Sequence, residues 1–321
     1  MVGNKKPLGR WKWGIITAVI LVIVAVPLII YIAADREQKE LNDSTRSQLG
    51  GSYIRLSNGV THYQLAGPPG GKVIVLIHGA TIPMYIWDAQ FQPLADAGFR
   101  VLRYDMFGKG YSDRPEASYD QAFYRKQLIE LLDALNIKQP VDLVGISMGG
   151  GTAIDFTASY PERVRRLVLA APLINSIKND GNIKILRPPV WGEFLCRLIA
   201  VNSITTRAGE LMKQFPNPDA YVLKFKEQTY YKGFERALLS MFRSDANGDY
   251  TADYIDVARQ GDRKIMLIWG TEDGDITYAM IQQIRNYIIP TQYVQLDGIG
   301  HDPQVEVPEF FNGLVINFLK Q

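Results

Sequence analysis

The chain has 321 residues, 47% of them hydrophobic, and a formal net charge of +2 at pH 7. This composition is typical of a folded globular protein, and the length suffices for one large α/β domain with an insertion or for two small domains. The charge shows no basic surplus that would indicate nucleic-acid binding. A single cysteine, Cys196, excludes an internal disulfide framework and a cysteine-based zinc site, and with three histidines we expect no metal or cofactor.

Residues 14–34 form an uncharged run of 21 residues dominated by Ile, Val, Leu and Ala, and residues 1–13 before it are basic. As a helix this run would extend roughly 31 Å, close to the ~30 Å hydrocarbon core of a bilayer. Trp11 and Trp13 stand where interfacial aromatic residues are expected. We therefore predict a single transmembrane helix over 14–34. The competing interpretation is a signal peptide cleaved at Ala33-Ala34, whose apolar run would usually be shorter, about 7–15 residues.

The basic N-terminal flank also predicts the orientation of this helix. Lysine and arginine beside a membrane-spanning segment favour the cytoplasmic side, so we expect a cytoplasmic N-terminus. The rest of the chain would then lie outside, in a periplasmic, extracellular or lumenal space. Residues 35–50 are polar and predict a juxtamembrane linker.

Strand and helix patterns alternate from residue 51 onward. Asn58-Gly59 between two alternating segments predicts a β-hairpin, in which His62 is expected to be a half-exposed strand residue. The later apolar runs are continuous, as in strands of a parallel sheet that are buried on both faces. Predicted strands cover residues 72–77, 99–104, 141–146, 164–170, 264–269 and 292–296, and predicted helices include 87–97, 119–135 and 307–320.

The alternation stops between two of these strands. Residues 173–262 are mostly helical in pattern and rich in aromatic side chains. We predict that they form a helical cap over the carboxyl edge of the sheet, while residues 51–172 and 263–321 form the α/β core. Most apolar side chains of the cap would build its own core, and a few would line the space above the serine described next.

Gly145-Ile-Ser147-Met-Gly149 joins a predicted strand to a helix that begins with small residues. A nucleophilic serine at such a turn needs this strand–turn–helix context, because the turn leaves almost no room for side chains two residues away on either side. It also holds the serine in a strained backbone conformation, and the following helix directs free N–H groups to the same point. The alternative is a glycine-rich turn with a solvent-facing serine.

A serine hydroxyl becomes a nucleophile only with a base beside it and an acid that orients the base. His301 is the predicted base, because it follows a late strand and so lies at the same sheet edge as Ser147. Asp273, on the loop after the preceding strand, is the predicted acid, and the order serine, aspartate, histidine suits this motif. Glu272 and Asp275 lie close enough in the sequence to compete for the acid's role.

The developing oxyanion needs two preorganised N–H donors. The amide of Met148, directly after the serine, is the first predicted donor. The second is expected from the loop after the strand at 72–77, where we choose the amide of Ala80, and the Thr81 hydroxyl could add to it. His78, at the start of that loop, is expected to brace it.

Together these residues resemble the α/β-hydrolase fold family over roughly residues 50–321. The matching segments are His78-Gly79, Asp105-Met-Phe-Gly108-Lys-Gly110-Tyr-Ser112, Gly145-Ile-Ser147-Met-Gly149-Gly150, Trp269-Gly270-Thr-Glu-Asp273 and Gly298-Ile-Gly-His301-Asp-Pro303. The resemblance implies an α/β class protein with a mostly parallel eight-stranded sheet, helices on both faces and a helical cap between strands six and seven. It also implies Ser147 as nucleophile, Asp273 as acid and His301 as base.

Within that family the chain is similar to esterases, membrane-anchored monoacylglycerol lipases and carbon–carbon bond hydrolases. Haloalkane dehalogenases and epoxide hydrolases carry aspartate at the position of Ser147, which argues against both. The family usually places a proline soon after the acid, and Gly274-Asp275-Ile-Thr277 lacks one.

Three functions follow as hypotheses. The first is a membrane-anchored serine hydrolase that cleaves carboxylic esters with lipophilic acyl chains, such as monoacylglycerols. The second is a carbon–carbon bond hydrolase with the same three residues, and the third is a catalytically silent binding protein on the same fold. Some anchored relatives of this kind favour a cytosolic domain, so the resemblance and the charge rule differ on the side of the membrane.

Overall fold

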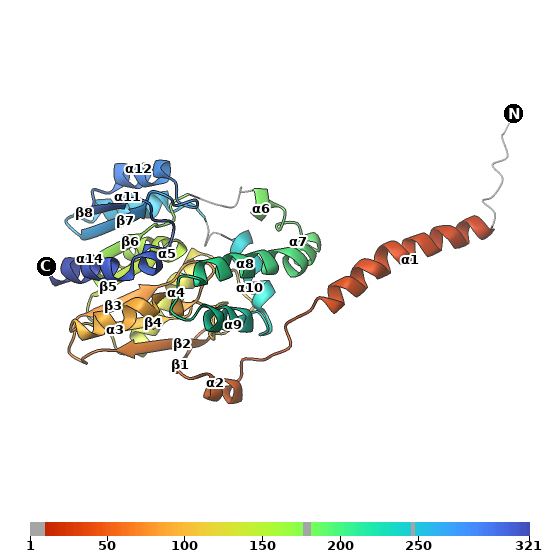
Figure 1. Ribbon diagram of the computed structural model, residues 1–321, viewed down its shortest axis with the longest axis horizontal. Helices are drawn as coiled ribbons and strands as arrows, with labels where there is room; N and C mark the ends of the chain where they lie inside the picture. Colours follow the sequence, from red (N-terminus) through yellow and green to blue (C-terminus); the bar gives the residue numbers. More distant parts are fainter. Residues whose placement is uncertain (1–9, 176–180, 245–247) are drawn as a thin grey trace.

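The computed structural model describes residues 10–175, 181–244 and 248–321 (Figure 1). Eight strands in these ranges form one sheet in the order β1-β2-β4-β3-β5-β6-β7-β8, and from β4 to β8 all neighbours are parallel. The strands are β1 Ser52–Leu56, β2 Gly59–Ala66, β3 Val73–Ile77, β4 Arg100–Tyr104, β5 Val141–Ile146, β6 Val164–Ala170, β7 Lys264–Gly270 and β8 Gln292–Leu296. The prediction of a mostly parallel eight-stranded sheet is confirmed.

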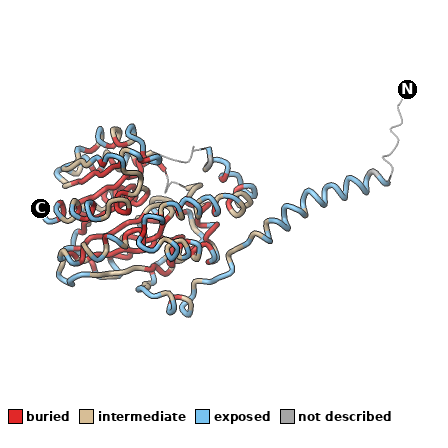
Figure 2. The backbone as a smooth tube through the Cα atoms, viewed as in Figure 1, coloured by how far each residue is buried: buried red, intermediate tan, exposed pale blue. Residues whose placement is uncertain are grey.

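The central strands are buried on both faces, as their continuous apolar runs predict. Every residue of β3 and β5 is buried, because helices cover both sides of the sheet (Figure 2). The hairpin of β1 and β2 is also present, but its two-residue connection is Ser57-Asn58, since Leu56 pairs with Gly59. The turn lies one residue before the predicted one, and the Glu130 carboxylate holds it by accepting hydrogen bonds from the Ser57 N–H and hydroxyl.

The helices of the core form two groups, one for each face of the sheet. Because the connections are right-handed, the helix between β3 and β4 lies on one face of the sheet, and the helices that connect β4 through β8 lie on the other face. Accordingly α3 packs against α14, whereas α4, α5, α11 and α12 pack as a second group. Their bounds are η1 Met84–Trp87, α3 Asp88–Asp96, α4 Gln121–Ala134, α5 Met148–Ser159, η2 Pro161–Arg163, α11 Thr251–Arg259, α12 Tyr278–Tyr287, α13 Pro303–Glu306 and α14 Pro308–Lys320.

Between β6 and β7 the described chain is helical. We call the elements α6 to α10 the helical insertion; α11, which follows them, packs against α5 with the core helices. The insertion is held by its own apolar side chains, such as Phe234, Leu238 and Met241 of α10, all buried. Its elements are α6 Gly181–Lys184, α7 Trp191–Leu195, η3 Cys196–Ala200, α8 Val201–Met212, α9 Pro218–Gln228 and α10 Phe234–Arg243.

The N-terminal helix α1, Arg10–Ala33, stands away from the rest of the protein (Figures 1 and 2). Its stretch Trp13–Ala33 is long and apolar enough to cross a bilayer and is not buried against the protein. Most of the predicted basic segment, residues 1–9, lies outside the described residues. Residues 35–50, the predicted linker, include the short helix α2, Asp43–Leu49, and Lys39 pairs with Tyr231 of the insertion.

Candidate active site

Ser147 lies at the apex of the predicted turn between β5 and α5. Its φ of 55° and ψ of −122° are strained values for a residue with a side chain. The turn requires glycine on both sides, because a Cβ on Gly145 would lie 2.4 Å from the Gly149 carbonyl oxygen and one on Gly149 would lie 2.3 Å from that of Ile77. The N–H groups of Gly150 and Gly151 donate to the Ser147 carbonyl oxygen, which begins α5 directly behind the serine.

The His301 imidazole and the Asp273 carboxylate form a hydrogen-bonded pair. Nδ1 of His301 lies 3.0 Å from each carboxylate oxygen of Asp273. The Asp273 side chain is fully buried, whereas that of His301 is 17% exposed. The carboxylate is fixed by its own loop, since Oδ1 also accepts hydrogen bonds of 2.8 Å from the N–H groups of Asp275 and Ile276.

The other two acidic residues of this loop take different positions. Glu272 is exposed, and its N–H donates to the Ile299 carbonyl oxygen. Asp275 lies on the opposite side of the imidazole, with Oδ2 at 3.8 Å from Nε2 of His301, and it forms an ion pair with Arg207 of α8. Among the three predicted acids, Asp273 is therefore the one placed to fix the Nδ1 tautomer.

The carboxylates around His301 favour its protonated form. Burial alone lowers the pKa of His301, but the Asp273 hydrogen bond and the charges of Asp302 and Asp275 outweigh burial and raise the pKa to about 9. Burial also raises the pKa of the neighbouring Asp302 carboxyl. The imidazole is thus held in a strongly negative environment, which would stabilise the imidazolium that forms when a base accepts a proton.

Ser147 and the His301–Asp273 pair lie at one edge of the sheet. Ser147 follows β5, Asp273 follows β7 and His301 follows β8, and the carboxyl ends of neighbouring parallel strands meet at the same edge. In the described structure the hydrogen bonds of the His301 ring go to Asp273, and none joins it to the Ser147 hydroxyl. Such bonds often tighten only when a substrate is bound.

The loop after β3 covers the serine from the other side. A Cβ on Gly79 would lie 3.4 Å from Cβ of Ser147, so Gly79 approaches the apex of the turn closely. His78 braces this loop as predicted, because its Nδ1 bonds to the Gly79 carbonyl oxygen at 2.7 Å and its Nε2 accepts from the Met106 N–H at 2.9 Å. Burial lowers the pKa of His78 to about 4, so the ring stays neutral.

The two predicted oxyanion donors have free N–H groups. Met148 is the first residue of α5, where an N–H has no acceptor within the helix. In the described ranges neither the Met148 N–H nor the Ala80 N–H donates to another backbone group. Both N–H groups therefore remain available to a hydrogen-bond acceptor.

The prediction for His62 is wrong: the side chain is buried, not half-exposed, and belongs to a second His–Asp pair. Its Nδ1 lies 2.7 Å from Oδ2 of Asp105, and the same carboxylate accepts hydrogen bonds from the N–H groups of Met84 and Tyr111. Burial opposes ionisation of Asp105, but the hydrogen bond and charge of His62, together with the Tyr111 N–H, outweigh burial and lower its pKa to about 2. Alternation along β2 could not reveal this burial, since Tyr53 and Tyr111, from other parts of the chain, pack against the His62 ring.

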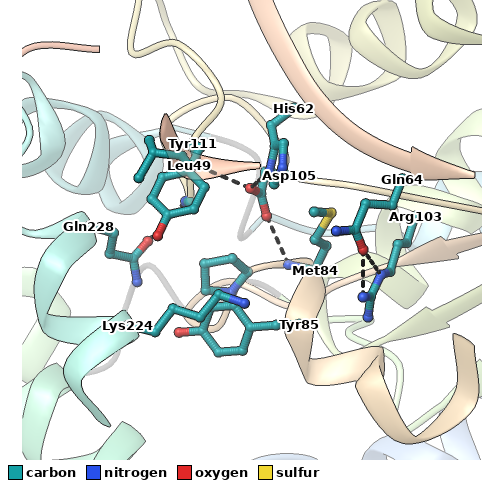
Figure 3. Close-up of a pocket in the computed structure, with 12 residues that line it drawn as sticks. Leu49, His62, Gln64, Met84, Tyr85, Arg103, Asp105, Tyr111, Lys224 and Gln228 are labelled. Carbon is teal, nitrogen blue, oxygen red and sulfur yellow. Dashed lines mark hydrogen bonds and ion pairs between the residues drawn. The ribbon is translucent and has the colours of Figure 1, made fainter. Parts of the chain in front are cut away.

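This second pair lines a cavity of about 100 Å³ that does not include Ser147. Figure 3 shows Asp105 contacting His62 and the Met84 backbone, with Arg103 and Gln64 on one side and Lys224 and Gln228 of α9 on the other. The pair connects β2, η1 and the loop after β4, and we assign it a structural role.

Comparison with known proteins identifies the family. The family model described as alpha/beta hydrolase fold matches residues 72–308. The chain therefore belongs to the α/β-hydrolase fold family.

Relatives in this family include several hydrolases. The chain is 31% identical over 228 residues to a 2-hydroxymuconate semialdehyde hydrolase of Pseudomonas putida, covering 69% of this chain and 77% of that protein. A meta-cleavage product hydrolase from Pseudomonas fluorescens IP01 has 26% identity and a TM-score of 0.65, with 84% of this chain and 97% of that chain covered. A membrane phospholipase A described as a bacterial virulence factor has 19% identity and a TM-score of 0.68, with 98% of both chains covered.

Proposed function

We propose that the protein is a membrane-anchored serine hydrolase that cleaves carboxylic esters. One observation carries this proposal: a buried Asp273 holds Nδ1 of His301 at the sheet edge where Ser147 lies in a strained turn. In this arrangement Ser147 is the nucleophile, His301 the base and Asp273 the acid that orients it. Met148 and Ala80 supply the oxyanion donors.

The reaction proceeds in two halves. The Ser147 hydroxyl adds to the ester carbonyl carbon while its proton passes to Nε2 of His301, and the oxyanion is bound by the N–H groups of Met148 and Ala80. Collapse of this intermediate breaks the bond to the alcohol, which leaves with the proton from His301. Water then attacks the acyl-enzyme, again with His301 as base, and releases the carboxylic acid and free Ser147.

We further propose lipophilic acyl esters, such as monoacylglycerols, as the substrate class. The apolar exposed helix α1 supports retention at a membrane, and residues 14–34 would span it with the N-terminus cytoplasmic and the domain outside. The similarity in shape to a membrane phospholipase A over nearly the whole chain also supports this class. Residues 51–172 and 263–321 would form the catalytic core, and residues 173–262 the cap over it.

A carbon–carbon bond hydrolase is the second candidate. The observation that favours it is the 31% identity to a 2-hydroxymuconate semialdehyde hydrolase. In that case the same serine, histidine and aspartate would act on a vinylogous diketone, and the membrane helix would have no evident purpose.

Activity-based labelling tests the proposal. The detergent-solubilised full chain should react with a fluorophosphonate probe, and Ser147→Ala should abolish the reaction while Ser112→Ala, which alters a buried serine on another loop, leaves it intact. Labelling that survives Ser147→Ala would contradict the assignment of the nucleophile. A panel of p-nitrophenyl esters of increasing chain length, set against a vinylogous diketone, separates the two reactions.

A further inference from the structure

The last turn of α1 and the residues after it are fixed to the helical insertion. The Arg197 guanidinium of η3 donates to the Tyr31 carbonyl oxygen at 3.1 Å and lies 3.9 Å over the Tyr31 ring. The same side chain pairs with Glu235 of α10 at 2.8 Å and with Asp35 at 3.7 Å. Arg197 thus joins the end of α1, the following segment and the insertion at one point.

Residues 35–40, which we call the strap, extend this attachment along the insertion. The Glu37 carboxylate accepts hydrogen bonds from the N–H groups of Gly233 and Glu235 and so caps the N-terminus of α10. Lys39 exchanges two backbone hydrogen bonds with the chain at Tyr230 and Lys232. The insertion therefore keeps a fixed position relative to α1.

The part of the insertion next to α1 ends in an exposed apolar surface. The Tyr31 ring stacks on Phe194, with centroids 6.3 Å apart, and Phe194 contacts Trp191 edge-on at 6.1 Å. Beyond them Ile185, Val190 and Trp191 are 53%, 79% and 66% exposed. We call residues 184–191 the tip; it lies beside the end of α1 nearest the domain (Figure 1).

The charged side chains on the tip are all positive. Lys184 and Arg187 are exposed beside the apolar side chains, and residues 184–191 contain no acid. Exposed aliphatic and tryptophan side chains flanked by lysine and arginine are typical of surfaces that lie in the interface of a bilayer with anionic headgroups. An open groove of about 590 Å³ beside Tyr31 is lined by paired arginines and glutamates, which suits the hydrated headgroup layer and not the hydrocarbon core.

We infer that the tip of the helical insertion docks on the anionic lipid surface of the membrane that α1 enters. The strap would hold the insertion against this surface, so that an ester leaving the bilayer meets the insertion before the sheet edge. This inference rests on the proposal that α1 spans a membrane. It adds a lipid-contacting surface on an element distant in sequence from that helix.

Site-directed fluorescence tests the docking. Val190→Cys, labelled with an environment-sensitive fluorophore in the full chain reconstituted into phosphatidylglycerol-containing nanodiscs, should show a blue-shifted emission that brominated lipids quench. Ile289→Cys is the matched control, since Ile289 is 93% exposed on the loop before β8, and β8 lies on the side of the domain away from α1 (Figure 1). Cys196 is buried, so the unsubstituted chain should take up little label.

A third label distinguishes failure of the docking from failure of the anchor. Val22→Cys places the fluorophore in the middle of α1. Lipid quenching at residue 22 but not at residue 190 would overturn the docking while leaving the anchor intact, and absence of quenching at both would overturn both. A blue shift at residue 190 without lipid quenching would indicate cover by protein, such as a second copy, and would also overturn the inference.

Activity provides an independent readout. Lys184→Glu with Arg187→Glu should lower hydrolysis of an ester embedded in anionic vesicles by about tenfold and reduce its salt dependence, because two favourable surface charges become repulsive. Hydrolysis of a water-soluble short ester should be unchanged. Equal loss on both substrates would contradict a role at the membrane surface.

Discussion

Two His–Asp pairs in this chain have nearly the same internal geometry but different surroundings. His62 meets Asp105 at 2.7 Å and His301 meets Asp273 at 3.0 Å, both through Nδ1. The difference lies at the other ring nitrogen. Nε2 of His62 is buried without a hydrogen-bond partner in the described structure and faces Gly51, whereas His301 is partly exposed at the edge that holds Ser147.

A His–Asp pair therefore does not by itself define an active site. What matters is whether the free nitrogen faces a space that a substrate can enter, with a nucleophile and N–H donors beside it. Of the two pairs, the His301 pair is the one that is partly exposed and follows strands at the edge where Ser147 follows β5. The His62 pair instead connects β2 with η1 and the loop after β4.

Substituting each histidine should have the largest effects and should separate the roles of the two pairs. His301→Gln should lower kcat/KM for a short ester by about 10⁴-fold or more, because the base is lost. His62→Ala should instead destabilise the fold by about 3–5 kcal/mol, because it leaves the buried Asp105 carboxylate without its partner.

Ester kinetics, normalised to fluorophosphonate-labelled enzyme, and thermal denaturation measure the two effects. The activity of His62→Ala per labelled site should remain close to that of the unsubstituted protein. A loss of activity per labelled site as large as that of His301→Gln would show that the two pairs do not have separate roles.

A smaller effect is expected on the pH dependence of the reaction at His301. The base must be neutral to accept a proton, and the pKa of His301 is raised from 6.5 to about 9. We therefore expect kcat/KM to rise with pH up to about 9. Asp275→Asn removes a negative charge 3.8 Å from Nε2 and should shift this profile to lower pH.

A pH–rate profile of the two proteins at constant ionic strength checks this expectation. An unshifted profile for Asp275→Asn would show that its charge does not act on the base.

The raised pKa also means that protonated His301 stabilises the fold fully below pH 6.5, and that this stability is lost as pH rises through about 9.

The smallest effect is expected at Gly51, behind the structural pair. Gly51 has a φ of +81°, and a Cβ there would lie 2.2 Å from Nε2 of His62, so Gly51→Ala should destabilise the protein by about 1–3 kcal/mol. Gly50→Ala is the control, because Gly50 has a φ of +68° but nothing within 4 Å of its Cβ position. Denaturant unfolding of both variants would isolate the contact with His62, and equal stabilities would show that backbone strain alone is responsible.

Much of the fold was predictable from the sequence. The continuous apolar runs predicted the buried parallel strands, and Gly145 and Gly149 predicted the tight turn at Ser147. The hairpin was predicted with its turn displaced by one residue, because Glu130 of a later helix holds Ser57. The roles of Ser147, His301, Asp273, Ala80 and Met148 remain proposals, although the structure brings His301 and Asp273 into contact.

By itself the sequence determined the local features: which segments are strands, where the chain turns tightly and which run is apolar enough for a bilayer. These depend on residues that are neighbours in the chain, so their spacing and composition suffice to predict them. Only the tertiary structure decided which carboxylate meets the His301 ring, that His62 is buried against Asp105, and that the strap is fixed to the helical insertion. These contacts join segments far apart in sequence, and a shift of a few ångströms in a loop decides between Asp273 and Asp275.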